Sequence, residues 1–230
     1  MVKSIMIYFF IAIYISSCTS YTKSFEPKEK MIEFFTPGYL EDFQEASFKI
    51  SIETFDNHFG GIMVAKKLET NHYRFAFLNE FGGKMIDFEI INRELKLNYA
   101  IDQLNRKIIL NLLEKDFSML FLEEILIEKE FAQNQSRILQ SEKFTGNKNL
   151  YYELNQDRQL NKIILAKGKE KIRIALENSS KSFPEIEISH KKLPIKIYLH
   201  LLGNNVKLHN EKTVCCKHIP IDVRAFTGTN

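Results

Sequence analysis

Residues 72–100 read HYRFAFLNEFGGKMIDFEIINRELKLNYA. In the last seven, Glu94–Ala100, apolar and polar residues alternate, which is the period of a β-strand with one face in water. Turn-forming residues divide the stretch at Gly82-Gly83 and again at Asn92-Arg93. The pattern therefore predicts three consecutive antiparallel strands joined by short turns.

Further strands extend this meander in both directions. Upstream, Phe48, Ile50 and Ile52 alternate with polar residues, and a second segment at 62–68 follows a turn at Asp56-Asn57. Downstream, beyond residue 149, strands are predicted at 150–154, 160–167, 171–178, 185–189 and 194–201.

Between the two groups of strands the apolar period changes to that of a helix. Asp102 is a suitable cap for a helix over Gln103–Leu113, and the apolar cluster from Phe117 to Ile127 predicts one or two more helices, bent near Asp116. The fold class is therefore mainly β with helices (α+β). About ten consecutive antiparallel strands rarely stay flat, so we expect a curled, incomplete β-barrel lidded by the central helical insert.

A curled sheet of this size encloses an apolar space, which holds either packed side chains or a lipid-sized ligand. Both alternatives stay open, because every residue that would line a cavity is also an ordinary core residue. The predicted ligand-binding residues are Phe48, Ile50, Phe75, Phe77, Leu95, Leu97, Ile108, Leu112, Ile172 and Ile174.

Near the N-terminus, Lys3 precedes an apolar run from Ile5 to Ile15, and this run is followed by Ser16-Ser17-Cys18. The run is too short to span a bilayer as a helix but fits the apolar region of a secretory signal. The arrangement resembles the signal and lipobox of a bacterial lipoprotein. That resemblance implies a signal peptide at 1–17 and a lipidated Cys18; an ordinary signal peptide and an uncleaved anchor are the alternatives.

The remaining chain is predicted to divide into three parts. Residues 18–38 are expected to be a tether with one short helix around Glu29–Phe35, residues 39–202 the folded domain, and residues 203–230 an irregular tail. Fully extended, the tether would reach on the order of 60 Å.

Composition excludes some functions. The net charge is only +3, with basic and acidic residues interspersed, so no nucleic-acid partner is expected. With Cys18 acylated, only Cys215 and Cys216 remain, and adjacent cysteines do not suit ordinary disulfide geometry. His209 and His218 lie near this pair, but the spacing matches no closed zinc pattern, so we expect an exposed tail, no metal and no cofactor.

Most of the mature chain resembles the LolA/LolB family, whose members carry lipoproteins across the periplasm to the outer membrane. The matching pattern is the tethering cysteine, Phe59-Gly60-Gly61-Ile62, Tyr73-Arg74-Phe75, and the turn Asn79-Glu80-Phe81-Gly82-Gly83 leading to Ile86-Asp87-Phe88. The family has an incomplete antiparallel barrel lidded by short helices. LolB also exposes an apolar residue ahead of a glycine in the matching turn, which implies a membrane-insertion loop at Phe81, Gly82 and Gly83; the alternative is that Phe81 folds back onto the barrel rim.

The resemblance implies a protein that binds acyl chains and helps to receive or insert lipoproteins or lipids, with a soluble LolA-like carrier as partner. It also implies the periplasmic face of the outer membrane, since Thr19 is not the aspartate of an inner-membrane retention signal. The alternative is a docking lipoprotein of an envelope complex that has no ligand cavity. Nucleophile-elbow, metalloprotease and phosphate-loop motifs are absent, so we expect no enzyme.

Overall fold

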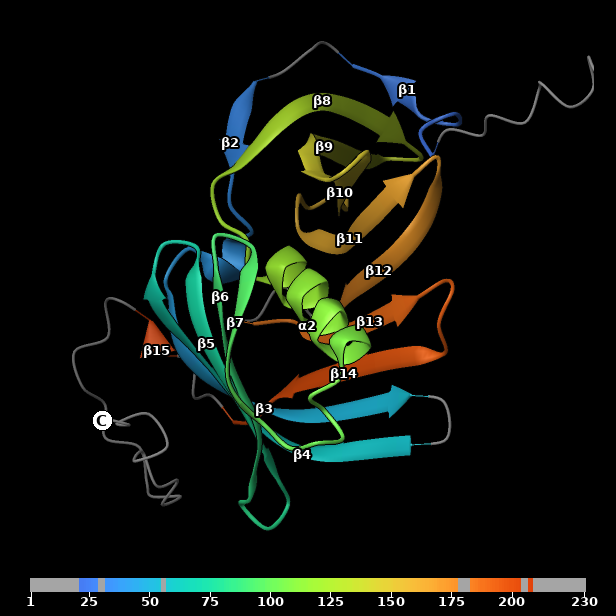
Figure 1. Ribbon diagram of the computed structural model, residues 1–230. Helices are drawn as coiled ribbons and strands as arrows, with labels where there is room; N and C mark the ends of the chain where they lie inside the picture. The colour runs from blue at the N-terminus through green and yellow to red at the C-terminus, as the bar shows by residue number, and fades with distance from the viewer. Residues whose placement is uncertain (1–20, 29–31, 55–56, 178–182, 204–206, 209–230) are drawn as a thin grey trace, which may run out of the picture.

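The computed structural model describes residues 21–28, 32–54, 57–177, 183–203 and 207–208 (Figure 1). The predicted signal peptide and Cys18 lie outside these residues. So do Cys215, Cys216 and both histidines of the C-terminal tail.

The described residues form one antiparallel sheet, in which fifteen strands follow the order β1-β8-β9-β10-β11-β12-β13-β14-β3-β4-β5-β6-β7, with β2 beside β8 and β15 beside β3. The strands are β1 (Glu26–Pro27), β2 (Glu33–Phe35), β3 (Phe43–Thr54), β4 (Asn57–Glu69), β5 (His72–Asn79), β6 (Lys84–Ile91), β7 (Glu94–Ala100), β8 (Ile125–Gln133), β9 (Ser136–Thr145), β10 (Lys148–Leu154), β11 (Leu160–Lys167), β12 (Lys169–Glu177), β13 (Glu185–His190), β14 (Ile195–Leu201) and β15 (Lys207–Leu208).

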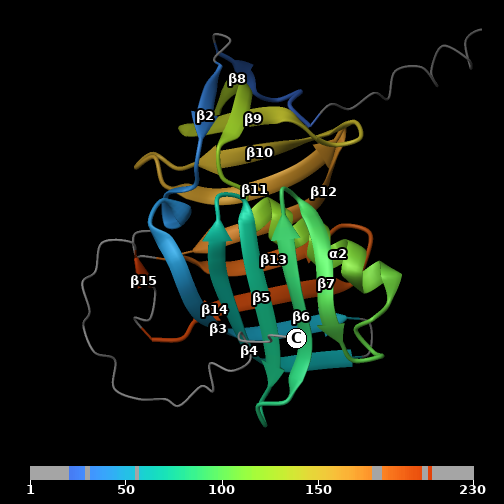
Figure 2. The same ribbon diagram turned by 60° about the vertical axis from the view of Figure 1, so that its left-hand side comes forward.

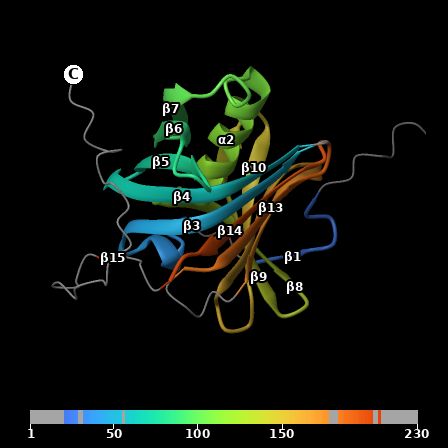
Figure 3. The same cartoon turned by 90° about the horizontal axis from the view of Figure 1, so that it is seen from below.

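The sheet curls but does not close into a barrel. After β7 at one end of the sheet, the chain forms the helix α2 (Lys107–Leu120) and then enters β8 near the other end. Figures 1 and 3 show α2 on the concave side, between β5–β7 and the opposite strands. The predicted curled, antiparallel, mainly β fold is thus confirmed, and each of the ten predicted strands overlaps a strand of the structure.

The helical insert differs from the prediction. Within the described residues a single α-helix, α2, is present, and Ile125 and Ile127, predicted to be helical, lie in β8. Pairing explains the difference, because β8 receives β9 on one side and β2 on the other, which satisfies its backbone without a helix. The turn between β8 and β9 lacks glycine, although Asn134 and Gln135 have positive φ angles of 50° and 80°, so the sequence gives only a weak turn signal there.

The predicted cap is also displaced. Asp102 lies before α2 rather than at its start, because Leu104 and Asn105 donate backbone hydrogen bonds to the carbonyl of Ile101 and form a separate turn. The N-cap position of α2 is Arg106, whose side chain makes no capping hydrogen bond. The helix is therefore stabilised mainly by the core beneath it.

Aromatic side chains make up the centre of that core. The ring of Phe117 on α2 lies 4.8 Å from that of Phe75 and 5.4 Å from that of Phe88, and the ring of Phe121 lies 4.9 Å from that of Phe75. All four side chains are buried. Burying each aromatic side chain contributes about 1.5–3 kcal/mol, so this cluster fixes the C-terminal half of α2 to β5 and β6.

The segment expected to be a free tether packs on the sheet instead. β1 and β2 pair with β8 and cover its outer edge, and Glu33–Phe35, expected to be helical, is the strand β2. Farther toward the N-terminus, Tyr21 and Phe25 cover an apolar patch on the convex face, formed by Phe131, Ile138, Tyr151, Ile164 and Ala166. Covering a sheet edge satisfies backbone groups that would otherwise pair with other chains.

The C-terminal tail contributes one described strand beyond residue 203, because Lys207 and Leu208 pair with Glu45 and Phe43 of β3. In the part of the chain that the structure describes, no helix has the length and apolar character needed to cross a membrane.

Candidate functional site

The helix α2 covers an apolar groove on the concave side of the sheet. Its C-terminal half is buried, from Leu113 and then Asp116 to Leu120, whereas side chains between Lys107 and Leu112 are exposed or half-buried. The groove lies beneath the less buried, N-terminal half of α2. It is lined by Ile50, Ile52, Thr54, Phe59, Met63, Phe77, Ile86, Phe88, Leu104, Ile109, Leu112, Leu113, Phe117, Ile195 and Ile197.

The structure separates the predicted ligand-binding residues into three groups. Three of them line the groove itself, namely Ile50, Phe77 and Leu112. Six others belong to the core or pack against it: Phe48, Phe75, Leu95, Leu97, Ile172 and Ile174. The last, Ile108, is 51% exposed. One turn of the helix therefore separates a side chain directed into the groove from one directed into solvent.

The cavity volume of the groove is only about 40 Å³. One water molecule occupies about 30 Å³ of liquid, and pockets for drug-sized ligands measure about 300–1,000 Å³. The groove is thus closed in this structure, and side chains fill the interior of the curled sheet. An acyl chain would enter only if α2 moved away from the sheet.

A buried ion pair attaches α2 to the opposite side of the sheet. His190 Nε2, at the end of β13, lies 3.0 Å from Asp116 Oδ1, and the two side chains are 4% and 0% exposed. His190 Nδ1 lies 3.3 Å from the carbonyl oxygen of Ile195. No sequence signal links His190 to Asp116, which lies 74 residues away in the chain.

Burial and pairing both change the pKa values of this pair. Burial raises the pKa of the Asp116 carboxyl more than the hydrogen bond from His190 lowers it. Burial acts to lower the pKa of His190, but the hydrogen bond and charge of Asp116 outweigh it and raise that pKa above its usual value. Asp116 Oδ2 has no hydrogen-bond partner, so His190 is the only group of the described chain that bonds this carboxyl.

The β5–β6 turn presents Phe81 to solvent. Asn79 Oδ1 accepts hydrogen bonds from the backbone N–H groups of Phe81, at 3.0 Å, and Gly83, at 2.8 Å. Gly82 has a φ of +80°, which favours glycine. The turn is therefore held in one conformation, with the Phe81 side chain 95% exposed. The predicted loop residues Phe81, Gly82 and Gly83 lie together at this tip, as the sequence indicated.

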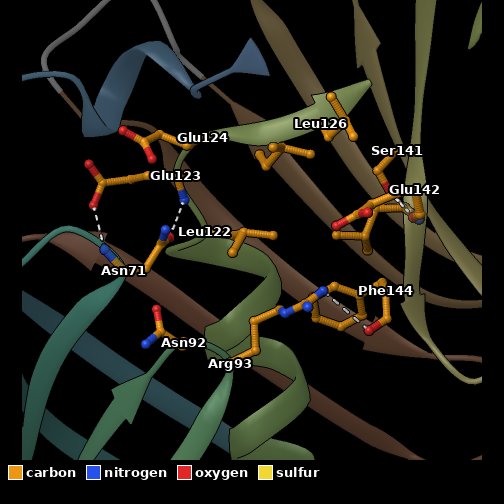
Figure 4. A pocket seen from close by; sticks show the side chains of 12 residues that line it. Asn71, Asn92, Arg93, Leu122, Glu123, Glu124, Leu126, Ser141, Glu142 and Phe144 are labelled. Carbon is orange, nitrogen blue, oxygen red and sulfur yellow. Dashed lines mark hydrogen bonds between the residues drawn. The ribbon is translucent and has the colours of Figure 1, made fainter. Parts of the chain in front are cut away.

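A second cavity, of about 210 Å³, lies where the two ends of the sheet approach each other (Figure 4). Arg93 on the β6–β7 turn donates to the carbonyl of Phe144, and its guanidinium lies 5.6 Å from the Phe144 ring centroid. Glu123 accepts hydrogen bonds from Lys67 and Tyr73. Burial of the Tyr73 hydroxyl, and then its hydrogen bond to Glu123, raise the pKa of Tyr73. These contacts join the ends of the sheet, and sequence analysis did not predict this cavity.

The convex face of β5–β7 carries a second polar network. Arg74 donates two hydrogen bonds to Asp87, at 3.0 and 2.9 Å. Burial acts to raise the pKa of Asp87, but hydrogen bonds from Arg74 and Asn98 outweigh it and hold the pKa below its usual value. Beside it, His72 lies 2.8 Å from Glu89. Asp87 and Glu89 each have basic partners, so the carboxylates on this face are neutralised by ion pairs within the protein.

No cluster of three or more histidine, cysteine, aspartate or glutamate residues suited to a metal ion occurs among the described residues. Comparison of the chain with models of protein families gives no match, and comparison with curated proteins gives none either.

Proposed function

We propose that this protein is an outer-membrane lipoprotein, anchored through Cys18 and facing the periplasm, that binds an acyl chain beneath α2. In this role it helps to receive or insert lipoproteins or lipids, and it acts by binding and transfer rather than by bond chemistry. The observation that carries the proposal is the apolar groove covered by the less buried half of α2. The fold is accordingly proposed to be an incomplete barrel with α2 as its lid.

The proposed binding step is a movement of the lid about its fixed end. Phe117, Phe121 and the Asp116–His190 pair attach the C-terminal half of α2, whereas the side chains of Lys107–Leu112 are exposed or half-buried. Lifting this half would widen the groove between Leu112 and strands β3, β4 and β14. Each CH₂ group that enters contributes about 0.8 kcal/mol, which favours opening for a long acyl chain.

The proposed exchange step uses the rigid β5–β6 turn. A single aromatic side chain that is 95% exposed on a fixed turn suits insertion into a lipid surface or an apolar site on a carrier. We propose that Phe81 contacts the partner with which the acyl chain is exchanged, such as a soluble LolA-like carrier.

The experiment that tests the proposal compares two leucine-sized side chains on one helix. Leu112→Gln places a polar group in the groove, and Ile108→Gln is the matched control because Ile108 already faces solvent. The parent is expected to bind a fluorescent fatty acid, and Leu112→Gln is expected to weaken binding by about 1–2 kcal/mol, or roughly tenfold, without an effect of Ile108→Gln. Equal binding by both variants would contradict the groove as the site.

The small cavity favours a second candidate function. A core already filled with side chains suits a docking lipoprotein that presents its surface to an envelope complex and binds no lipid. Native mass spectrometry of the protein purified from a Gram-negative periplasm separates the two candidates. Copurified acyl chains support the carrier, whereas a parent without lipid that also refuses added fatty acid supports the docking protein.

A further inference from the structure

The chain is attached to the folded body from Tyr21 onward. The Tyr21 ring lies 4.7 Å from the ring of Tyr151 and 5.2 Å from that of Phe25, and the Phe25 ring lies 6.1 Å from that of Phe131. Directly afterwards, Glu26 and Pro27 pair with β8. The N-terminal segment is therefore part of the sheet edge and of the apolar patch beside it.

This attachment leaves a short connection to the proposed anchor. Cys18 and Tyr21 are three residues apart, and a fully extended chain covers at most about 3.6 Å per residue, or about 11 Å in all. The polar layer on each side of a bilayer is about 5–8 Å thick. With Cys18 acylated, the end of the body that carries Tyr21 is thus held at the membrane surface.

The same end exposes two large apolar side chains. Ile32 is 69% and Phe34 is 74% exposed, and they alternate with Glu33, which is directed to Arg137 at 3.5 Å. Phe35, on the other face of β2, packs at 5.2 Å against the Tyr152 ring in the core. Alternation along β2 therefore directs Ile32 and Phe34 away from the protein interior.

The Phe81 turn lies at the opposite end of the molecule. Figures 1 and 2 both show the edge formed by β1, β2 and β8 at the top and the turn between β5 and β6 at the bottom. The two exposed apolar groups therefore cannot reach one flat bilayer together while the N-terminal segment keeps its place on the sheet.

We propose that the edge formed by β1, β2 and β8 is the membrane-facing surface of the anchored protein, with Phe34 and Ile32 in the bilayer interface and Phe81 directed away from it. This inference rests on the proposed lipid anchor, and it gives Phe81 a partner in the periplasm rather than in the anchoring membrane. The exposed charges along this edge have both signs: Glu26 lies on β1, Lys28 directly after β1, and Lys129 on β8. The contact with the bilayer therefore depends on apolar side chains rather than on net charge.

Depth-dependent fluorescence quenching tests this orientation. The full chain, with Cys215→Ser and Cys216→Ser, is reconstituted through its Cys18 lipid in phosphatidylcholine vesicles that contain nitroxide-labelled lipid. A fluorophore is attached to a cysteine introduced by Phe34→Cys in one sample and by Phe81→Cys in the other. Both positions are exposed, so the substitutions leave the core unchanged.

We expect strong quenching at position 34 and none at position 81. Quenching at position 81 alone, at both positions or at neither would overturn the proposed orientation. Mass spectrometry of the N-terminal peptide keeps the two proposals distinct. A lipidated Cys18 combined with an unquenched position 34 refutes the orientation and leaves the anchor in place, whereas a chain without lipid refutes the anchor and the orientation together.

Discussion

Replacing His190 by leucine tests how α2 is attached to the sheet. Two unit charges 3.0 Å apart attract each other by about 5.5 kcal/mol at an effective dielectric constant of about 20, and burial of both groups offsets part of this. Because His190, through Oδ1, is the only hydrogen-bond partner of the Asp116 carboxyl among the described residues, His190→Leu leaves this buried carboxyl without a hydrogen-bond donor. The expected cost is about 3–5 kcal/mol of unfolding free energy.

Urea unfolding at pH 6, followed by circular dichroism, measures this cost in a double-mutant cycle. Asp116→Leu/His190→Leu removes both polar groups and is expected to recover at least about 2 kcal/mol relative to His190→Leu alone. A cost below about 1 kcal/mol for His190→Leu, or strict additivity of the two single substitutions, would refute the reasoning.

The same pair predicts a pH dependence with a definite sign. The pKa of His190 is raised on folding from its ordinary 6.5, so its contribution is complete below pH 6.5 and is lost as pH rises through the folded value. The neighbouring charge of Lys115 opposes the shift without reversing it. The parent should therefore lose stability as pH rises above 6.5, whereas Asp116→Leu/His190→Leu should not. An equal decline in both proteins would exclude the pair as its cause.

Four further substitutions have expected outcomes. Gly61→Ala should cost about 3 kcal/mol or more, since its Cβ would lie 2.0 Å from the Leu78 carbonyl oxygen, whereas Gly38→Ala, with no atom within 4 Å, should be nearly neutral in thermal unfolding. The lowered pKa of Asp87 contributes stability above pH 3.8 that is lost as pH falls further, so Asp87→Asn should reduce the loss of stability measured between pH 5 and pH 3. Phe81→Ser should change the unfolding free energy by less than about 0.5 kcal/mol, because the ring is 95% exposed; a larger loss would mean that the ring packs on the protein.

The strands could be predicted because local pattern specifies them. In Glu94–Ala100 the alternation assigns one face to the core, and the structure pairs this segment with β6 as a strand of the expected length. The glycine-flanked turn at Phe81 also followed from local signals, but these signals left open whether the ring is exposed or folds back onto the sheet, and the structure leaves it 95% exposed. Ile125 and Ile127 show the limit, because a short apolar run fits a helix and a buried strand equally well, and only pairing with β2 and β9 decides between them.

The amino-acid sequence by itself indicated ten of the fifteen strands, the turns between most of them and the lipobox-like N-terminus, since each of these depends on residues close together in the chain. Only the tertiary structure decided that Leu112 faces the groove and Ile108 faces solvent, that Asp116 meets His190, and that Tyr21 lies against Tyr151. These contacts join residues up to 130 positions apart, and the curl of the whole sheet brings them together. Local periodicity carries no information about such distances, because it fixes the face of an element and not the neighbour that covers it.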